Sequence, residues 1–290
     1  MKKKLLGTLL AAVMTAAMLA GCGNTGDSSD SADGEKDAKT EDTEKKADAS
    51  EDAKDEAASD DNTFTVGFDQ EFPPMGFVDE NGEFTGFDLE LAEEVANRLG
   101  MKFVPQPISW DAKDMELDSG TIDCIWNGFT MTGREDQYTW SEPYLKNAQV
   151  FVVADSSIKT REDLAGKIVE VQADSSAEAA LKEDPDLTGT FAQLQTVPDY
   201  NTAVMDLQQG AVDAIAMDKV VAAYQIEGRG EELTILDDEL QAEEYGIGFK
   251  LGNTDLRDKV QSTLEEMASD GKLAEISTKW FGEDITTVGK

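Results

Sequence analysis

The amino-acid composition of the chain changes at Thr63, and this boundary limits which part of the chain can fold. Residues 23–62 contain only Gly, Ser, Thr, Ala, Asn, Asp, Glu and Lys, with no aromatic and no branched aliphatic side chain. Such a segment cannot bury enough apolar surface to offset the entropy lost on ordering, so we expect it to be disordered. From Thr63 onward apolar residues return in regular patterns. The folded body is therefore predicted to span residues 63–290.

The N-terminus is typical of an export signal. Three lysines precede an apolar run from Leu5 to Leu19, and this run of about 15 residues is shorter than the roughly 20 that cross a bilayer. It ends in Leu19-Ala20-Gly21-Cys22, which resembles the lipobox of bacterial lipoproteins, where the chain is cut before an acylated cysteine. We expect residues 1–21 to be a signal peptide and 22–62 a tether. Its lipid (palmitate) on Cys22 would hold the exported protein at the outer face of the cell membrane. The alternative is an ordinary signal peptide with an incidental cysteine.

Charge and composition exclude several classes of function. The chain has 25 Lys and Arg against 61 Asp and Glu, a net charge of −36, and no histidine. So acidic a chain repels phosphate backbones, and we expect no nucleic-acid partner. The lack of histidine excludes Ser-His-Asp hydrolases and His-ligated zinc enzymes. Nothing in the sequence indicates a metal, a nucleotide or any other cofactor, and we expect none.

Strand and helix patterns alternate at short spacing through the folded body. Strands are predicted over 63–68, 102–108, 122–126, 148–153, 167–171, 191–197 and 211–216. Helices are predicted over 88–99, 111–117, 160–165, 177–182, 201–208, 220–226, 256–269 and 273–281. This alternation favours an α/β fold, with parallel sheets covered by helices.

One nine-residue pattern occurs twice. Leu117–Ile125 and Leu207–Ile215 both read as a helix end, a glycine, two further residues, an aspartate and a buried strand. The repeat suggests two similar α/β lobes that each expose the carboxyl end of an equivalent strand. Ligands bind at such strand ends in open α/β sheets, so two facing ends would make a cleft. The alternative is a generic helix–turn–strand connection.

Several sequence blocks together resemble one known family. They are Val66-Gly67-Phe68-Asp69, Phe72-Pro73-Pro74-Met75, Gly86-Phe87-Asp88-Leu89-Glu90-Leu91-Ala92, Ser119-Gly120-Thr121-Ile122-Asp123, Thr130-Met131-Thr132-Gly133-Arg134, Trp140-Ser141-Glu142-Pro143-Tyr144, Gly210-Ala211-Val212-Asp213-Ala214 and Lys279-Trp280-Phe281-Gly282. In order and spacing they resemble family 3 of the bacterial extracellular solute-binding proteins, the polar amino-acid receptors of ABC importers, over residues 64–290.

The resemblance implies an architecture. The family has a two-lobed periplasmic-binding-protein type II fold, with two parallel-type sheets joined by two hinge strands. By this resemblance lobe one comprises 63–152 plus 247–290, and lobe two comprises 153–246. The hinges would be Ala148–Val153 and Tyr245–Phe249.

The resemblance also implies a ligand site. Its residues would be Asp69, Phe72, Trp110, Asn127, Gly128, Thr130, Arg134, Ser175, Ser176 and Asp218. Arg134, aligned with a one-residue gap, would bind the carboxylate of an amino acid through its planar fork, assisted by the Ser175-Ser176 loop. Asp218, with the Gly128 carbonyl and the Thr130 hydroxyl, would bind the ammonium group.

Specificity would come from the residues around the ligand side chain. Phe72 and Trp110 would sandwich it and Asp69 would meet its tip, with Asn127 as a further contact. Asp174 stands where the family usually has glycine, and its charge would oppose carboxylate binding. Several alternatives stay open: Asp218 as the N-cap of the following helix, Phe72 or Trp110 as core, and Arg134 as a surface residue. Trp126 and Cys124 are expected to be core.

The expected function follows from this resemblance. The protein would be a lipid-anchored, monomeric receptor that captures a free polar L-amino acid, with Arg, Lys, His or Gln favoured, and delivers it to an ABC permease. It would not be an enzyme. The alternatives are an enzyme on the same fold, similar to cyclohexadienyl dehydratase, or a ligand-sensing domain of a signalling system.

Overall fold

The structure, a computed structural model, describes residues 62–229 and 233–290. These residues belong to one compact unit, Asp55–Lys290. The predicted signal peptide, the lipobox with Cys22 and the tether lie outside the described residues. Within the described ranges no helix combines the length and the apolar character that crossing a membrane requires.

The described chain is built around a mixed sheet with strand order β10-β9-β11-β8-β13-β6-β1-β5, in which β12 also pairs with β8 and β7 with β13. Its strands are β1 Thr63–Phe68, β5 Lys102–Pro107, β6 Cys124–Thr130, β7 Thr139–Trp140, β8 Leu145–Val153, β9 Ile168–Gln172, β10 Gln193–Val197, β11 Ala214–Asp218, β12 Thr234–Ile235 and β13 Gln241–Phe249. A small antiparallel sheet holds β2 Glu71–Phe72, β3 Gly76–Val78 and β4 Phe84–Thr85.

Helices occur between the strands, as the alternating pattern predicts. They are α1 Phe87–Leu99, α2 Lys113–Ser119, α3 Ser176–Glu183, α4 Pro185–Thr188, α5 Tyr200–Gln209, α6 Lys219–Arg229, α7 Thr254–Asp270 and α8 Lys272–Phe281, with short 3₁₀ turns η1 Trp110–Ala112 and η2 Arg161–Leu164. The apolar stripe of α1 is buried at Leu91, Ala92, Val95 and Ala96, as its 3.6-residue periodicity predicts. The expected core residues Trp126 and Cys124 are both fully buried.

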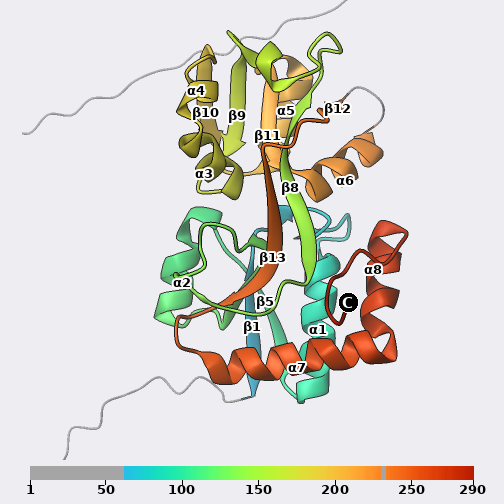
Figure 1. Cartoon of the computed structure of the whole chain (residues 1–290). Helices are drawn as coiled ribbons and strands as arrows, with labels where there is room; N and C mark the ends of the chain where they lie inside the picture. The colour runs from blue at the N-terminus through green and yellow to red at the C-terminus, as the bar shows by residue number, and fades with distance from the viewer. Residues whose placement is uncertain (1–61, 230–232) are drawn as a thin grey trace, which may run out of the picture. The chain divides into compact units, whose positions relative to one another are not determined.

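Two long strands join the two groups of parallel strands. β8 and β13 pair antiparallel, from Gln241 opposite Gln149 to Tyr245 opposite Leu145. On its other edge β8 pairs with β11, while β13 pairs with β6. Figure 1 shows β8 and β13 running side by side between the two groups. Because both strands are paired on both edges, the two predicted sheets are linked into one hydrogen-bonded path. The parallel strands therefore fall into two lobes. One lobe contains β1, β5 and β6, and the other contains β9, β10 and β11.

The repeated pattern occupies equivalent places in the two lobes. Gly120 and Gly210 both have a left-handed backbone, with φ of 79° and 72°, and end α2 and α5. The carboxylate of Asp123 then accepts from the Thr65 N–H at 2.7 Å. In the second lobe the carboxylate of Asp213 accepts from the Ile168 N–H at 2.8 Å. Each aspartate thus ties its own strand to the first strand of its lobe.

β6 differs from its prediction in a way that matters for the site. The predicted strand covered 122–126, whereas β6 runs from Cys124 to Thr130. The polar residues Asn127 and Thr130 end the apolar pattern, but pairing with β13 continues, with Tyr245 opposite Thr130. The strand therefore carries polar side chains into a buried position at its carboxyl end.

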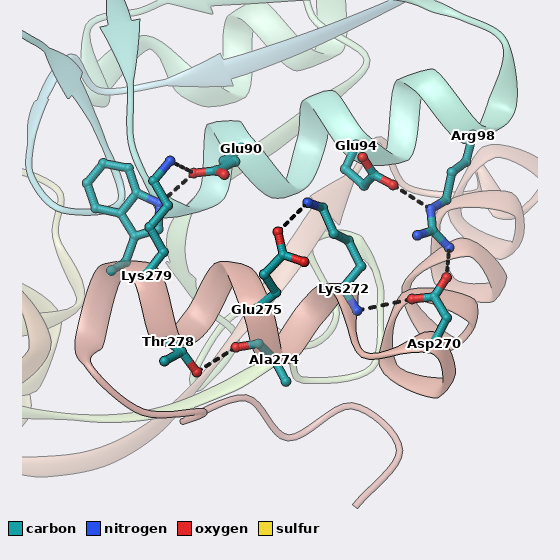
Figure 2. Close-up of polar contacts among 10 residues, drawn as sticks. Glu90, Glu94, Arg98, Asp270, Lys272, Ala274, Glu275, Thr278 and Lys279 are labelled. Atoms are coloured by element: carbon teal, nitrogen blue, oxygen red, sulfur yellow. Dashed lines mark hydrogen bonds and ion pairs between the residues drawn. The ribbon is translucent and has the colours of Figure 1, made fainter.

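The last two helices return to α1. Figure 2 shows Glu90 of α1 accepting from Lys279 at 2.6 Å and from the Trp280 indole at 2.8 Å. Arg98 of α1 bridges Glu94 and Asp270, at 2.7 Å to each. These contacts place the chain after β13 on the lobe that contains β1.

Candidate functional site

A cavity lies at the carboxyl ends of the parallel strands. It is lined by Asp69, Phe72, Trp110, Asn127, Gly128, Thr130, Arg134, Gln172, Ser175, Ser176 and Asp218. The structure therefore brings together around one cavity all the residues that the resemblance assigned to the ligand. Gln172, at the end of β9, is the lining residue that the sequence did not indicate.

The ends of β1 and β6 form one wall of the cavity. The Asp69 N–H, just after β1, donates to Asn127 Oδ1 at 3.0 Å. Asn127 Nδ2 is buried and has no hydrogen-bond partner. A buried N–H without a partner is costly, so this amide is an unsatisfied donor in the wall of the cavity.

Gly128 in this wall is closely packed by aromatic rings. Its φ is +55°, and an added Cβ would lie 3.0 Å from the Phe72 ring and 3.1 Å from Tyr245. The Gly128 N–H donates to Asp88 Oδ2 at 2.6 Å, and Tyr144 donates its hydroxyl to the same oxygen at 2.9 Å. Complete burial raises the pKa of Asp88 to about 7. Asp88 therefore fixes the Gly128 backbone through a hydrogen bond. The sequence did not indicate this role, although an aspartate at the start of an apolar helix is unusual.

Arg134 brings a positive charge to the cavity. Its guanidinium donates to the backbone oxygens of Thr130 at 3.2 Å and Asp174 at 3.3 Å, and lies 5.2 Å from the Phe129 ring centre. Within the described residues no carboxylate forms an ion pair with it. The fork is held by neutral groups, so its charge remains to be matched by an anion.

The charge of Asp174 is paired with a lysine side chain. Its carboxylate forms an ion pair with Lys113 of α2, whose side chain is only 2 % exposed. Its φ of 59° explains the glycine preference at this position, because few residues other than Gly, Asn and Asp adopt this conformation. Lys113 therefore offsets the negative charge that was expected to oppose carboxylate binding.

The Ser175-Ser176 loop begins α3. Ser175 Oγ accepts from the Glu178 N–H at 3.1 Å and caps the helix. Ser176 Oγ accepts from Gln149 Nε2 at 2.9 Å and from Thr130 Oγ1 at 3.2 Å. The Thr130 contact joins the two lobes across the cavity.

Asp218, at the end of β11, is the buried anion of the site. Its side chain is 2 % exposed, and Oδ1 accepts from Tyr245 at 2.6 Å, Gln149 at 2.8 Å and Asn147 at 2.9 Å. Burial and the charge of Glu243 raise the pKa of Asp218 well above its ordinary value. Val220, in the first turn of α6, donates its N–H to Asn147 Oδ1 instead of to Asp218, so these bonds do not favour the N-cap alternative.

The residues assigned to the ligand side chain also line the cavity. Asp69 Oδ2 accepts from Gln172 Nε2 at 2.7 Å, again across the lobes, and burial raises the pKa of Asp69 to about 6. Phe72 lies 5.9 Å from Tyr200, centre to centre. Trp110 packs edge-on to Phe129 at 5.5 Å and also lines the cavity. Trp110 is therefore only partly buried: its ring packs on Phe129 and also lines the cavity.

Comparison with known proteins agrees with this geometry. The model of the bacterial extracellular solute-binding proteins, family 3, matches residues 64–283. The L-cystine-binding protein TcyJ of Escherichia coli K12 is 33% identical over 228 residues, which cover 77% of this chain and 84% of TcyJ. The L-cystine-binding protein TcyA of Bacillus subtilis is 30% identical over 291 residues, 99% of this chain and 100% of TcyA.

A solved structure gives the same result. The substrate-binding protein of an ABC uptake transporter from Streptococcus pneumoniae, with bound histidine, is 37% identical and superposes with a TM-score of 0.76, covering 78% of this chain and 95% of that one. All three relatives are binding proteins by name. The fold is that of the type II periplasmic amino-acid-binding proteins. With the family model, these matches show that the chain belongs to family 3 of the bacterial extracellular solute-binding proteins.

Proposed function

We propose that this protein captures one free polar L-amino acid in the cavity between its lobes and delivers it to the permease of an ABC importer. The observation that carries the proposal is the pair of opposite charges left without an ionic partner in the cavity. Arg134 has no carboxylate and Asp218 has no cation among the described ion pairs. Both charges line the same cavity.

A zwitterion matches this pair of charges. Burying a charged group without a partner costs several kcal/mol, so an amino acid enters favourably only where both its ends are paired. In the proposed pose Arg134 and the Ser175-Ser176 loop bind the carboxylate, while Asp218 binds the ammonium group. The Gly128 carbonyl and the Thr130 hydroxyl complete the ammonium site.

The remaining lining residues support a choice of ligand side chain. Asp69 and Asn127 contribute a carboxyl group and an amide, and Phe72 and Trp110 contribute rings. An aromatic ring attracts a cation or stacks on a flat polar group. We propose arginine, lysine, histidine and glutamine as candidates, and cystine as a fifth because two relatives bind it.

Isothermal titration calorimetry tests the function directly. The chain from Gly23 onward, which keeps the compact unit whole and omits Cys22, is titrated with each of the twenty common amino acids and with L-cystine. We expect tight binding of one or a few polar amino acids with a stoichiometry of about one. Binding of none of them would contradict the proposed function.

We also propose that Cys22 carries a lipid after cleavage and holds the protein at the outer face of the cell membrane. The support is the Leu19-Ala20-Gly21-Cys22 motif and the export of the family. Cell fractionation of the full-length chain is the test, with Cys124→Ser as the matched control. Cys22→Ser is expected to move the protein from the membrane to the released fraction, and its retention at the membrane would contradict the anchor.

A further inference from the structure

A second buried carboxylate lies beside Asp218, outside the set of cavity-lining residues. Glu243 of β13 is 4 % exposed, against 2 % for Asp218. Asn147 Nδ2 donates to Glu243 Oε1 at 2.6 Å and to Asp218 Oδ1 at 2.9 Å. Gln149 Nε2 donates to the same two oxygens, at 2.8 Å each. The two carboxylates therefore converge on one pair of amide donors on β8.

No positive group of the described chain balances this carboxylate pair. None of the ion pairs between described residues involves Asp218 or Glu243. The titratable groups that interact with the pair are Tyr245 on β13 and Tyr200 on α5. Neither of them is positively charged. Two adjacent negative charges in a buried site repel strongly, so a proton or a bound cation must balance one of them.

The hydrogen bonds also leave room for a donor at this pair. Glu243 Oε2 is buried and has no hydrogen-bond partner. Gln149 Oε1, in the same cluster, is likewise buried and without a partner. Buried polar atoms of this kind are normally satisfied, so the cluster lacks donors rather than acceptors.

We propose that Asp218 and Glu243 share one proton in the empty protein, and that the ammonium group of the ligand replaces it. This inference rests on the proposed function and specifies how the site binds the ammonium group of the ligand. On binding, the carboxyl O–H bond breaks and the proton passes to solvent or buffer, while a ligand N–H donates to the freed carboxylate. Glu243 is thus a positioning residue: it sets the protonation of Asp218 without lining the cavity.

The direction of the pH dependence follows from the raised pKa. Burial and the Glu243 charge raise the pKa of Asp218 in the empty site, and the adjacent ammonium lowers it in the complex. Below the raised pKa, binding must expel a proton, so affinity weakens as the pH falls, by up to about tenfold per pH unit. Above it the pair is already ionised, and affinity no longer depends on this proton.

The test counts the protons exchanged on binding. The chain from Gly23 is titrated by calorimetry in buffers of different ionisation enthalpy, between about pH 5 and pH 7. The probe is the tightest binder among L-glutamine, L-arginine and L-cystine, whose side chains do not titrate in this range. The variant is Glu243→Gln, and the matched control is Glu244→Gln, the next residue on β13, which is exposed. Asp69→Asn is included because the pKa of Asp69 is also raised, to about 6.

We expect the wild-type protein and Glu244→Gln to release close to one proton at the acidic end, with affinity falling by up to about tenfold per pH unit. Glu243→Gln should bind with less than about half of this proton release and a flatter pH profile. Asp69→Asn removes only the part of the release that comes from Asp69, so the reduction caused by Glu243→Gln should remain when the two substitutions are combined.

Three results would overturn the proposal while leaving the proposed function intact. They are binding without proton exchange, unchanged release in Glu243→Gln, or release lost only in Asp69→Asn. Failure of every amino acid to bind would instead overturn the proposed function. Carboxyl-carbon NMR of the wild-type protein gives the same answer without a substitution. A shared protonation step of Asp218 and Glu243 must be present in the empty protein and absent in the complex.

Discussion

Single residues account for most of the chemistry of this protein. The cavity is lined by one guanidinium, that of Arg134, and by two buried carboxyl groups, those of Asp69 and Asp218. None of the three forms an ion pair with another described residue. The identity of each group matters as much as its charge. Arg134 offers two parallel N–H donors in a rigid plane, which suits a carboxylate and which a lysine ammonium does not reproduce.

Replacing Arg134 with lysine tests this geometric requirement. Arg134→Lys keeps the charge but loses the fork, so we expect amino-acid affinity to fall by about 10- to 100-fold, which equals roughly 1.4–2.7 kcal/mol. Calorimetry measures the change. Arg161→Lys, in η2 and away from the cavity, is the matched control and should bind as the wild-type protein does. Equal affinity of Arg134→Lys and wild type would contradict the bidentate role.

Asp88 makes a separate prediction about stability. Burial raises its pKa to about 7 in the folded protein, against about 4 in an unfolded chain. Between these values the folded state holds the proton more tightly than the unfolded state. The contribution of Asp88 is therefore fully present below about pH 4 and is lost as the pH rises through about 7.

Asp88→Asn removes this titration while retaining an oxygen for the Gly128 N–H and the Tyr144 hydroxyl. Thermal unfolding followed from about pH 4 to pH 7 should show a decline in melting temperature for the wild-type protein that is shallower in Asp88→Asn. Asp237→Asn, an exposed position, should behave as wild type. A variant that reproduces the full wild-type decline would contradict a buried, protonated Asp88.

Among the helices and strands, the sequence predicted those that are determined by local sequence patterns. Helices such as α1 and α5 follow from apolar periodicity and from the glycines that end them. The repeated helix–glycine–aspartate–strand pattern suggested two equivalent lobes, and Asp123 and Asp213 make matching hydrogen bonds to Thr65 and Ile168. Residues whose roles arise from contacts distant in sequence were not predicted. These are Asp88, Lys113, Gln172 and Glu243.

The same reason explains why the predicted strand over 122–126 had the wrong bounds for β6. A single-strand pattern ends where polar residues begin, yet β6 continues because β13, more than a hundred residues later in the chain, pairs with it. The site residues were identified through the family resemblance, because Asn127 and Thr130 carry no local signal for a buried strand position. Sequence patterns therefore located the elements, while the partners of the buried polar groups required the structure.

The ion pair between α2 and the loop before α3 provides a test at this scale. Lys113 is buried and pairs with Asp174 across the two lobes. Asp174→Asn tolerates the left-handed backbone but removes the charge, so the closed arrangement loses a charge-assisted bond. We expect the ligand dissociation rate to rise by about tenfold, as measured by stopped-flow fluorescence. Asp186→Asn, exposed on α4, is the control, and an unchanged rate in Asp174→Asn would contradict a role in closure.

For the whole molecule, we propose that β8 and β13 act as the hinges between lobe one, residues 63–152 plus 247–290, and lobe two, residues 153–246. The contacts that span the cavity, such as Asp69 to Gln172 and Thr130 to Ser176, belong to the closed arrangement. A ligand shifts the population toward closure only through the extra contacts it makes there.

Small-angle X-ray scattering of the chain from Gly23 detects this closure. The radius of gyration should decrease when the bound amino acid is added, and it should not change with an amino acid that calorimetry shows not to bind. Because residues 23–62 are the same in both samples, the difference reports on the folded body. Identical scattering with and without ligand would contradict a ligand-driven closure.

The central claim is that Arg134 and Asp218 hold the two ends of one amino acid. A crystal structure with the bound amino acid tests it most directly. We predict the ligand carboxylate within about 3 Å of the Arg134 guanidinium and the ligand ammonium within about 3 Å of the Asp218 carboxylate. A ligand in the cavity whose carboxylate or ammonium group contacts neither of these side chains would contradict the account.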